Sequence, residues 1–251
     1  MNAALFQLDG RRALVTGAGR GIGAGVARVL AEAGAAVTLV ARSVEEIEAL
    51  AETLREEGLD AQAAALDVTD IAAFESFVTD HPAPHMFVNN AGTNRPKPLS
   101  EVTPEDYDAV MDLNLRATIF AARAVSMRMA MQGVKGSIIN MSSQMGHVGA
   151  PNRTLYCASK WAVEGFTRAL SMECAKDGIR VNTVCPTFVD TPMTRPFLDD
   201  PTFQSEVLDR IRLGRLATVE DVAAAVLFLA SDAAGMITGS ALKVDGGWTA
   251  G

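Results

Sequence analysis

Seven short apolar runs alternate with stretches of helical periodicity, and this alternation constrains the fold more than any other feature of the chain. The runs are continuously apolar and do not alternate with polar residues, which is typical of strands buried on both faces of a parallel sheet. The pattern therefore predicts an α/β fold with a doubly wound parallel sheet of about seven strands and helices on both faces. The expected strands are 13–16, 36–41, 61–66, 86–89, 136–141, 180–185 and 241–244.

Between the strands, apolar residues recur at the three- and four-residue spacing of amphipathic helices. Thr103 is the expected N-cap of the longest helix, with Pro104 at its first position. No change of composition divides the chain, so we expect residues 1–251 to form a single domain. A Pro-, Arg- and Asp-containing excursion at about 187–215 is the expected lid over the substrate. The first expected helix runs through Val26, Leu30 and Ala33, and the others are 44–57, 71–77, 104–131, 154–175 and 219–229.

A glycine-rich turn, Thr16–Gly23, joins the first strand to the first helix. Such a turn lets a pyrophosphate approach the backbone and meet the free N–H groups of the helix N-terminus. The context that the motif requires is present, with a strand before it and a helix and second strand after it. We therefore expect a Rossmann-like dinucleotide site. The turn residues assigned to it are Gly17, Gly19, Arg20, Gly21, Ile22 and Gly23.

The end of the second strand indicates which dinucleotide is bound. A free ribose 2′-hydroxyl usually meets an acidic residue there, but the chain has none between Glu32 and Glu45. Arg42 and Ser43 follow the strand instead, and Arg20 lies in the turn itself. Two guanidiniums suit a 2′-phosphate, which accepts charge-assisted hydrogen bonds. NADP(H) is favoured on this basis, and NAD(H) stays possible.

A second group of polar residues lies between the fifth strand and the helix that follows it. Tyr156 and Lys160 are four residues apart, so their side chains share one helix face. Ser143 stands where the strand gives way to a loop, with Ser142 as its competitor. A phenol, an ammonium and a hydroxyl beside a nucleotide would form a centre for proton transfer.

The order of these motifs resembles the short-chain dehydrogenase/reductase family, in its single-domain branch and over essentially the whole length. The resemblance rests on Thr16–Gly23, on Asn-Asn-Ala-Gly at 89–92, on Asn114, and on Ser143 placed 13 positions before the Tyr156-x-x-x-Lys160 pair. It implies an NAD(P)-dependent oxidoreductase that moves a hydride between the nicotinamide cofactor and a carbonyl or secondary alcohol.

The resemblance also implies the catalytic roles. Tyr156 would be the acid in reduction and the base in oxidation, with its pKa lowered by the Lys160 ammonium and the oxidised nicotinamide. Lys160 would also bind the nicotinamide ribose. Ser143 would hold the substrate oxygen, because the family spacing favours it over Ser142, and Asn114 would hold a water on the proton route to solvent.

Further contacts with the dinucleotide are implied in the same way. Thr187 departs from the family pattern, because it stands where a glycine usually follows Pro186. The residues expected near the adenine, its ribose and the nicotinamide are Asp67 and Val68, then Asn90, Ala91 and Gly92, then Val189 and Thr191.

The expected substrate contacts are Gln144, His147 and Arg153 in the loop before Tyr156, and Arg95 after the fourth strand. Cationic and polar side chains suit a sugar, a polyol or another small hydroxylated or carboxylated molecule. A 3-oxoacyl-thioester (acyl carrier protein) reductase is the alternative, because Arg195, Arg212 and Arg215 could form a basic patch. A non-catalytic dinucleotide-binding regulator is the remote alternative. Such a protein would have no reason to keep Asn114, Ser143, Tyr156 and Lys160 together.

Composition limits the partners and the compartment. The formal net charge of −8 argues against general nucleic-acid binding, which needs a basic surface. No apolar run is long enough to span a membrane, and no signal pattern is seen at the N-terminus. Three cysteines without a Cys-x-x-Cys pair are typical of reduced thiols, so we expect a cytoplasmic protein.

No metal site is expected from the sequence. His81 and His85 have a metal-like spacing, but Pro82 and Pro84 between them prevent the helix that would present both to one ion. The two long helices at 104–131 and 154–175 carry more apolar residues than one sheet face needs. That excess, together with the resemblance, predicts a homotetramer or a homodimer.

Overall fold

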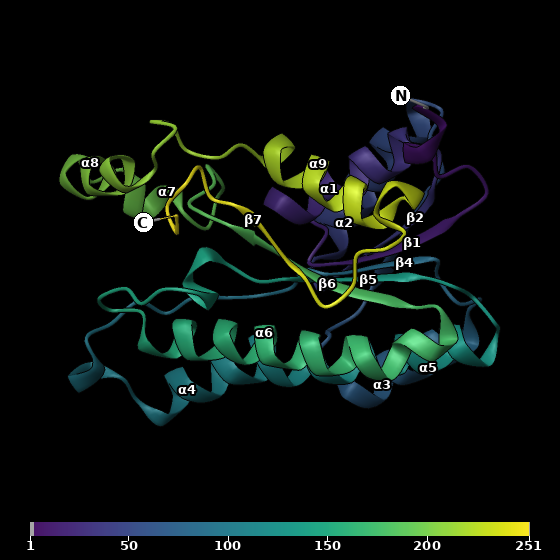
Figure 1. The fold of residues 1–251 in the computed structure, drawn as a ribbon, viewed down its shortest axis with the longest axis horizontal. Helices are drawn as coiled ribbons and strands as arrows, with labels where there is room; N and C mark the ends of the chain where they lie inside the picture. Colours follow the sequence, from purple (N-terminus) through teal and green to yellow (C-terminus); the bar gives the residue numbers. More distant parts are fainter. Residues whose placement is uncertain (1–2, 251) are drawn as a thin grey trace.

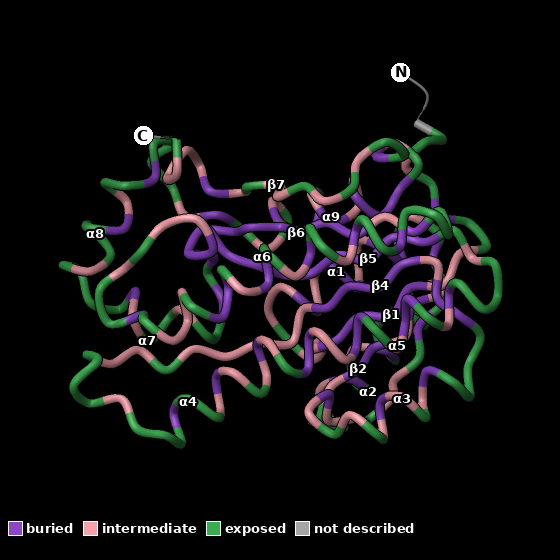
Figure 2. The backbone as a smooth tube through the Cα atoms, turned by 60° about the horizontal axis from the view of Figure 1, so that its bottom comes forward, coloured by how far each residue is buried: buried purple, intermediate pink, exposed green. Residues whose placement is uncertain are grey.

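The computed structural model describes residues 3–250, in which seven parallel strands form one sheet of order β3-β2-β1-β4-β5-β6-β7. The predicted Rossmann-like α/β fold is confirmed, because the order runs outward from β1 in both directions, as in a doubly wound sheet. Burial is concentrated in the central strands, whereas the edge strands β3 and β7 are more exposed (Figure 2). The bounds of the strands are β1 Arg12–Thr16, β2 Ala36–Ala41, β3 Ala61–Ala65, β4 Met86–Asn89, β5 Ser137–Met141, β6 Arg180–Pro186 and β7 Ala241–Val244.

The helices cover the two faces of the sheet (Figure 1). On one face lie α1 Gly21–Glu32, α2 Val44–Glu56 and α9 Val219–Ala230. On the other lie α3 Ile71–Asp80, α4 Pro104–Met111, α5 Thr118–Met131 and α6 Thr154–Cys174. Each layer closes its own apolar core, so the central strands are buried on both sides, which explains their continuous apolar sequence.

The long helix predicted for 104–131 is present but changes geometry in its middle. Its N-terminus is capped as expected, since the Thr103 hydroxyl accepts a hydrogen bond from the Asp106 N–H at 3.3 Å. A π-helical stretch, Asp112–Ala117, separates α4 from α5 and contains Asn114. Such single-turn π segments are frequent at functional sites, and periodicity alone does not reveal them.

The segment 187–215, predicted only as an irregular excursion, contains two short helices, α7 Arg195–Leu198 and α8 Pro201–Arg210. Leu198, Val207 and Ile211 turn inward and pack with Met145 and Phe188. The helices α7 and α8 lie beyond one end of the sheet (Figure 1), and this third apolar cluster packs them against Met145 in the loop that follows β5. Across the described chain, no helix combines the length and the apolar character needed to cross a membrane.

Candidate active site

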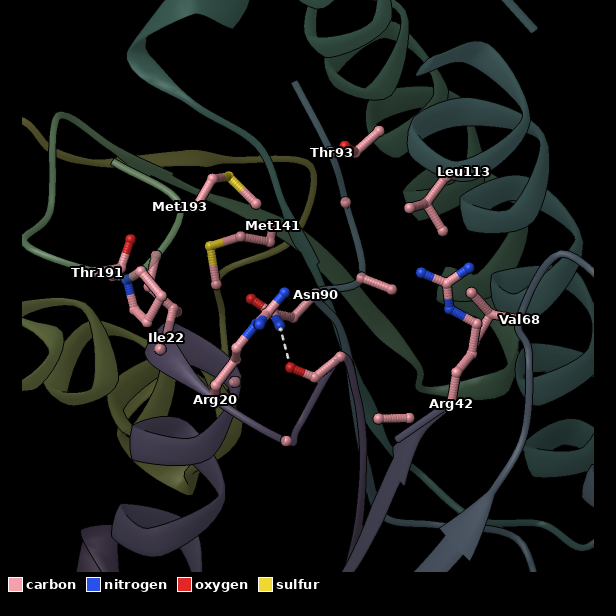
Figure 3. A pocket seen from close by; sticks show the side chains of 18 of the residues that line it. Arg20, Ile22, Arg42, Val68, Asn90, Thr93, Leu113, Met141, Thr191 and Met193 are labelled. Carbon is pink, nitrogen blue, oxygen red and sulfur yellow. Dashed lines mark hydrogen bonds between the residues drawn. The ribbon is translucent and has the colours of Figure 1, made fainter. Parts of the chain in front are cut away.

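A cavity of about 1040 Å³ opens where the carboxyl ends of the parallel strands meet. Its walls come from the turn after β1, the ends of β2 and β4, the start of α6 and the segment after β6 (Figure 3). All of the expected dinucleotide contacts line it: Gly17, Gly19, Arg20, Gly21, Ile22, Gly23, Arg42, Ser43, Asp67, Val68, Asn90, Ala91, Gly92, Tyr156, Lys160, Val189 and Thr191.

The glycine-rich turn is tied to the end of β4. The Asn90 side-chain amide donates to the Thr16 carbonyl at 3.0 Å and to the Gly17 carbonyl at 3.2 Å. The Thr16 hydroxyl in turn accepts from the Asn90 N–H at 3.0 Å. At Gly23 a Cβ atom would lie 2.1 Å from the Gly17 oxygen and 2.6 Å from the Asn90 amide nitrogen. This packing keeps the turn open and its N–H groups available, so the site fits a pyrophosphate.

We expect Gly23→Ala to abolish measurable dinucleotide binding, because the methyl group would force the Gly17 backbone away from the helix N-terminus. Gly149→Ala is the matched control, since a Cβ there meets nothing within 4 Å. NADPH titration monitored by its fluorescence, with circular dichroism to check folding, compares the two. A folded Gly23→Ala variant with wild-type affinity would contradict this account of the turn.

Two arginines flank the expected ribose-phosphate region of the cavity (Figure 3). The Arg20 and Arg42 side chains are 72% and 74% exposed. Each faces an acidic residue at long range, Arg20 with Glu46 at 3.6 Å and Arg42 with Asp67 at 3.8 Å. Exposed pairs of this length contribute little, so both guanidiniums are available to an incoming anion. Glu46 also lines the cavity but was not predicted, because it lies within α2 and not at the end of β2, where an acidic residue usually binds the ribose.

Tyr156 and Lys160 project from the first turns of α6 toward the same cavity. The Lys160 ammonium donates to the Met141 carbonyl at 2.8 Å and lies 5.6 Å from the centre of the Tyr156 ring. The Ser143 hydroxyl accepts from the Met145 N–H at 3.1 Å and donates to the Gln144 side chain at 3.0 Å. Ser143 thus shares the cavity with the phenol and the ammonium.

Withdrawal from water shifts the pKa values of both groups. Burial raises the pKa of Tyr156, and the hydrogen bond with Ser143 opposes that rise. Burial also lowers the pKa of Lys160, to about 8. Among the protein's own groups, withdrawal from water penalises the phenolate more than its neighbours favour it, and the lowering expected from the oxidised nicotinamide stays a prediction.

Asn114 does not line the cavity but lies directly behind it, completely buried in the π-helical turn. Its side-chain oxygen accepts from the Thr93 N–H at 2.7 Å, and its amide donates to the Thr93 carbonyl at 2.8 Å. A Cβ on Gly92 would fall 3.3 Å from this oxygen and 3.8 Å from the Lys160 nitrogen. Glycine at 92 therefore keeps the space between Asn114 and Lys160 open.

The expected substrate residues divide into different environments. Arg95 lines the cavity and donates to the Asp106 carboxylate at 3.2 Å. Gln144 is buried against Ser143. Arg153 is buried too, with its guanidinium carbon 5.1 Å from the ring centre of Phe197 in α7.

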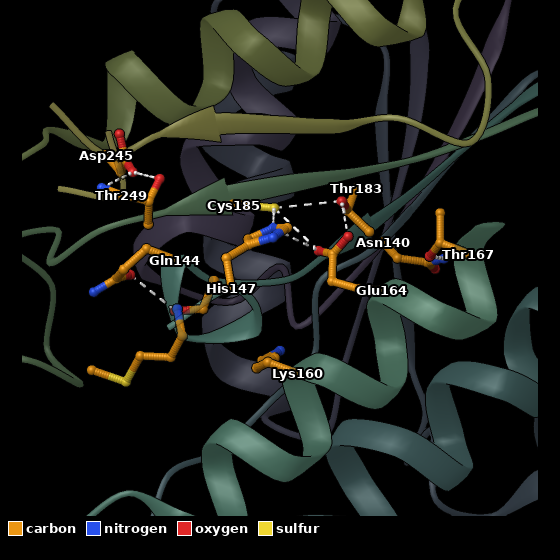
Figure 4. Close-up of polar contacts among 12 residues, drawn as sticks. Asn140, Gln144, His147, Lys160, Glu164, Thr167, Thr183, Cys185, Asp245 and Thr249 are labelled. Atoms are coloured by element: carbon orange, nitrogen blue, oxygen red, sulfur yellow. Dashed lines mark hydrogen bonds and ion pairs between the residues drawn. The ribbon is translucent and has the colours of Figure 1, made fainter. Parts of the chain in front are cut away.

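His147 was expected to face the substrate, but it does not line the cavity. The imidazole turns away from the cavity, and its Nε2 lies 3.4 Å from the Cys185 sulfur and 3.6 Å from the Glu164 carboxylate (Figure 4). The loop after Ser143 begins with a short 3₁₀ turn, Gln144–Gly146, which rotates the next side chain toward the sheet.

The departure at Thr187 leaves the backbone unstrained. Among the described residues other than glycine, only Asn152 has a positive φ, so Thr187 occupies a conformation open to any residue. Cavity residues that the sequence did not reveal include Leu113 and Met193 (Figure 3). Leu113 could have been found from its place beside Asn114, whereas Met193 carries no sequence signal.

Comparisons with known proteins find relatives that match nearly the whole chain. A family model described as enoyl-(acyl carrier protein) reductase matches residues 17–249. L-xylulose reductase from Mus musculus is 41% identical over 243 residues, which is 97% of this chain and 98% of that protein. D-threitol dehydrogenase from Mycolicibacterium smegmatis is 39% identical, over 97% of this chain and 95% of the relative.

Solved structures of similar fold and sequence also match nearly the whole chain. A gluconate 5-dehydrogenase from Burkholderia cenocepacia, in complex with NADP and tartrate, superimposes with a TM-score of 0.95 at 38% identity. The match covers 99% of this chain and 98% of that one.

Proposed function

The chain belongs to the short-chain dehydrogenase/reductase family, and from that premise we propose that it uses NADP(H) to interconvert a carbonyl and a secondary alcohol on a sugar, polyol or sugar acid. The observation that carries this proposal is the convergence of Ser143, Tyr156 and Lys160 on one cavity with the glycine-rich turn. The named relatives act on sugars, polyols or gluconate, which supports the substrate class.

NADP(H) is proposed over NAD(H) because of the charge at the adenosine end of the cavity. Arg20 and Arg42 offer guanidiniums to a 2′-phosphate, and their present partners, Glu46 and Asp67, hold them only at 3.6 and 3.8 Å. The gluconate 5-dehydrogenase of similar structure contains NADP, which supports this choice.

When bound, the nicotinamide supplies or accepts the hydride. Tyr156 gives its proton to the carbonyl oxygen during reduction and takes it back during oxidation. A phenol whose pKa is raised by burial is well suited to be the acid, because it stays protonated until the oxygen gains negative charge. Ser143 holds that oxygen, Lys160 supplies positive charge beside the phenol, and Asn114 holds the proton route behind Lys160.

Lys160 predicts the pH dependence of reduction. Its pKa of about 8 means that the ammonium is present below this pH and lost as the pH rises through it. We therefore expect kcat/KM for carbonyl reduction to fall above about pH 8. Lys160→Arg keeps a charge at all accessible pH values, so its pH profile should lack this alkaline decline even if its rate is low. The same decline in both proteins would contradict the assignment.

Arg153 favours an anionic group on the substrate. Its guanidinium is buried three residues before Tyr156, and its only hydrogen bond recorded for residues 3–250 is to the Asn152 carbonyl at 3.4 Å. No carboxylate in that range lies within ion-pair distance of it. A buried cation without a counter-ion is costly. A substrate carboxylate would supply the missing charge, so we propose a sugar acid as the preferred substrate.

The test of this function begins with NADPH and NADH titrations and continues with a substrate panel. The panel contains keto-sugar acids, the matching neutral keto-sugars and acetoacetyl thioesters. We expect turnover of the sugars with a preference for the acids. Arg153→Met should remove that preference by raising KM for the acids about 10–100-fold, the loss of a charged hydrogen bond, with little change for neutral sugars. Turnover confined to thioesters would instead establish the acyl-thioester reductase.

We propose that the exposed apolar surface of the long helices is a subunit interface in a homotetramer or homodimer. Trp161 and Met172 of α6 are 54% and 81% exposed, and Met127 and Met131 of α5 are 50% and 77% exposed. Exposed apolar side chains at this density commonly mark protein interfaces. Sedimentation should give an oligomer that Trp161→Glu dissociates, whereas a stable wild-type monomer would contradict the proposal.

We propose further that the chain works as one domain, with the 187–215 segment as a lid over a small-molecule substrate, in the cytoplasm. The lid is supported by Thr191, Met193 and Thr194, which line the cavity. The compartment is supported by three free cysteines. Limited proteolysis should cut 187–215 more slowly in the presence of NADPH and substrate, and an unchanged rate of cleavage would contradict the lid. Cell fractionation tests the compartment, and recovery of the protein from an oxidising compartment would contradict the cytoplasmic location.

A further inference from the structure

Three potential metal ligands meet behind the catalytic lysine, outside the cavity that holds the cofactor. They are His147 from the loop after Ser143, Glu164 from α6 and Cys185 from β6 (Figure 4). Their ligand atoms all lie within 4.8 Å of one another. The residues are separated by 17 or more positions in the sequence, so only the fold brings them together.

The spacing of the ligand atoms is that of a tetrahedral site. The sulfur lies 3.4 Å from the imidazole Nε2 and 3.2 Å from Oε1 of the carboxylate, and the nitrogen and oxygen are 3.6 Å apart. Zinc bonds of about 2.3 Å to sulfur and about 2.0 Å to nitrogen and oxygen, at tetrahedral angles, would separate the ligand atoms by about 3.3–3.6 Å. Two of the three observed distances fall in this range, and the sulfur–oxygen distance of 3.2 Å lies just below it, so small side-chain movements would form one face of such a tetrahedron.

Buried polar groups surround the cluster. Glu164 is 3% exposed, and the Thr183 hydroxyl donates to its second oxygen at 3.1 Å. Ser142 is also 3% exposed, and its hydroxyl lies beside the Cys185 thiol. The loop packs tightly on this cluster at Gly146, where a Cβ would lie 2.9 Å from the Ser142 oxygen and 3.2 Å from the Glu164 Cγ. The three ligand atoms therefore lie in a closely packed polar site.

We propose that His147, Glu164 and Cys185 bind one zinc ion. Soft thiolate and imidazole ligands select zinc over calcium or magnesium. Binding would release the Cys185 thiol proton to solvent and leave a thiolate, a carboxylate and a neutral imidazole around the cation. The summed ligand charge of minus two would balance the ion, as a buried site requires.

Such an ion would have a structural role next to the reaction centre. It would fasten the loop between Ser143 and Tyr156 to α6 and β6, because the three ligands come from those three elements. The ion has a route of entry from the loop side, where the His147 side chain is 15% exposed. Glu164 also stands one helical turn after Lys160, so the site would support the α6 face that carries the catalytic pair.

Cobalt substitution tests this proposal on the whole protein. The purified chain is stripped with EDTA, kept reduced with a phosphine and titrated with Co²⁺, which gives an intense sulfur-to-cobalt absorption band when a thiolate binds. We expect the band to saturate at one equivalent and to disappear when Zn²⁺ is added. Cys185→Ser should abolish the band. His147→Asn, at a partly exposed position, should weaken Zn²⁺ binding at least about 10–100-fold in competition with a chromophoric chelator.

Cys174→Ser is the matched control, because Cys174 is a buried free cysteine outside the cluster. It should keep both the band and the stoichiometry. Circular dichroism shows whether each variant is folded. If Cys185→Ser does not fold, the test rests on His147→Asn. The proposal is overturned if the wild-type protein gives no band, or if folded Cys185→Ser or His147→Asn binds Co²⁺ and Zn²⁺ as the wild type does. In either case, Ser142 and the cluster form only a hydrogen-bonded network. These readouts do not depend on turnover, so they stay separate from the proposed function.

Discussion

Replacing Tyr156 with phenylalanine should lower kcat for carbonyl reduction about 10²–10⁴-fold, the contribution of a positioned general acid. The ring would stay packed against the third apolar cluster, which contains Met145 and Phe188, and only the hydroxyl would be lost. Because the hydroxyl is the group that protonates the substrate oxygen, the loss should appear in kcat. The dissociation constant for NADPH should stay within about twofold, because Lys160 and the glycine-rich turn remain in place.

The chain offers a matched control for this substitution, since it has only one other tyrosine. Tyr107 lies in α4 and is 50% exposed, away from the cavity lining. Tyr107→Phe removes the same atom and should leave steady-state kinetics unchanged. Full oxidoreductase activity in Tyr156→Phe would show that the proton comes from another group and would remove the basis of the proposed mechanism.

Replacing Arg42 with alanine should raise KM for NADPH about 10–100-fold, because a charge-assisted hydrogen bond to the 2′-phosphate contributes about 1.5–3 kcal/mol. KM for NADH should change little, since that cofactor has a hydroxyl at this position. Loss of Arg42 also leaves the Asp67 carboxylate, now 3.8 Å from the guanidinium, free to accept from a ribose hydroxyl. The ratio of kcat/KM with NADPH to kcat/KM with NADH measures the change in cofactor preference.

Arg123→Ala controls for the loss of a surface cation, because Arg123 in α5 pairs with Glu75 at 2.6 Å and does not line the cavity. Its cofactor preference should match that of the wild type. If Arg42→Ala binds both cofactors as the wild type does, the 2′-phosphate argument is wrong at this position. Arg20 would then be the residue to vary next, because its guanidinium lies on the other side of the cavity (Figure 3).

The sequence predicted most elements because local and long-range requirements agreed. Strands such as β2 Ala36–Ala41 and β4 Met86–Asn89 have the bounds expected from their apolar runs. The cap at Thr103 was predictable because a hydroxyl followed by Pro104 satisfies local hydrogen bonding, whatever the helix packs against. The helices α7 and α8 were missed, because they are short and are held by packing on Phe188 more than by their own periodicity.

By itself, the sequence determined the α/β fold, the glycine-rich turn and the positions of Ser143, Tyr156 and Lys160, because each depends on spacing within one element or between consecutive ones. Only the tertiary structure decided which distant charges meet. It set Asp67 opposite Arg42, left Arg153 buried without a counter-ion among residues 3–250, and turned His147 from the cavity toward Glu164 and Cys185. Side-chain direction, burial and electrostatics depend on contacts between elements far apart in the chain, and no local pattern encodes them.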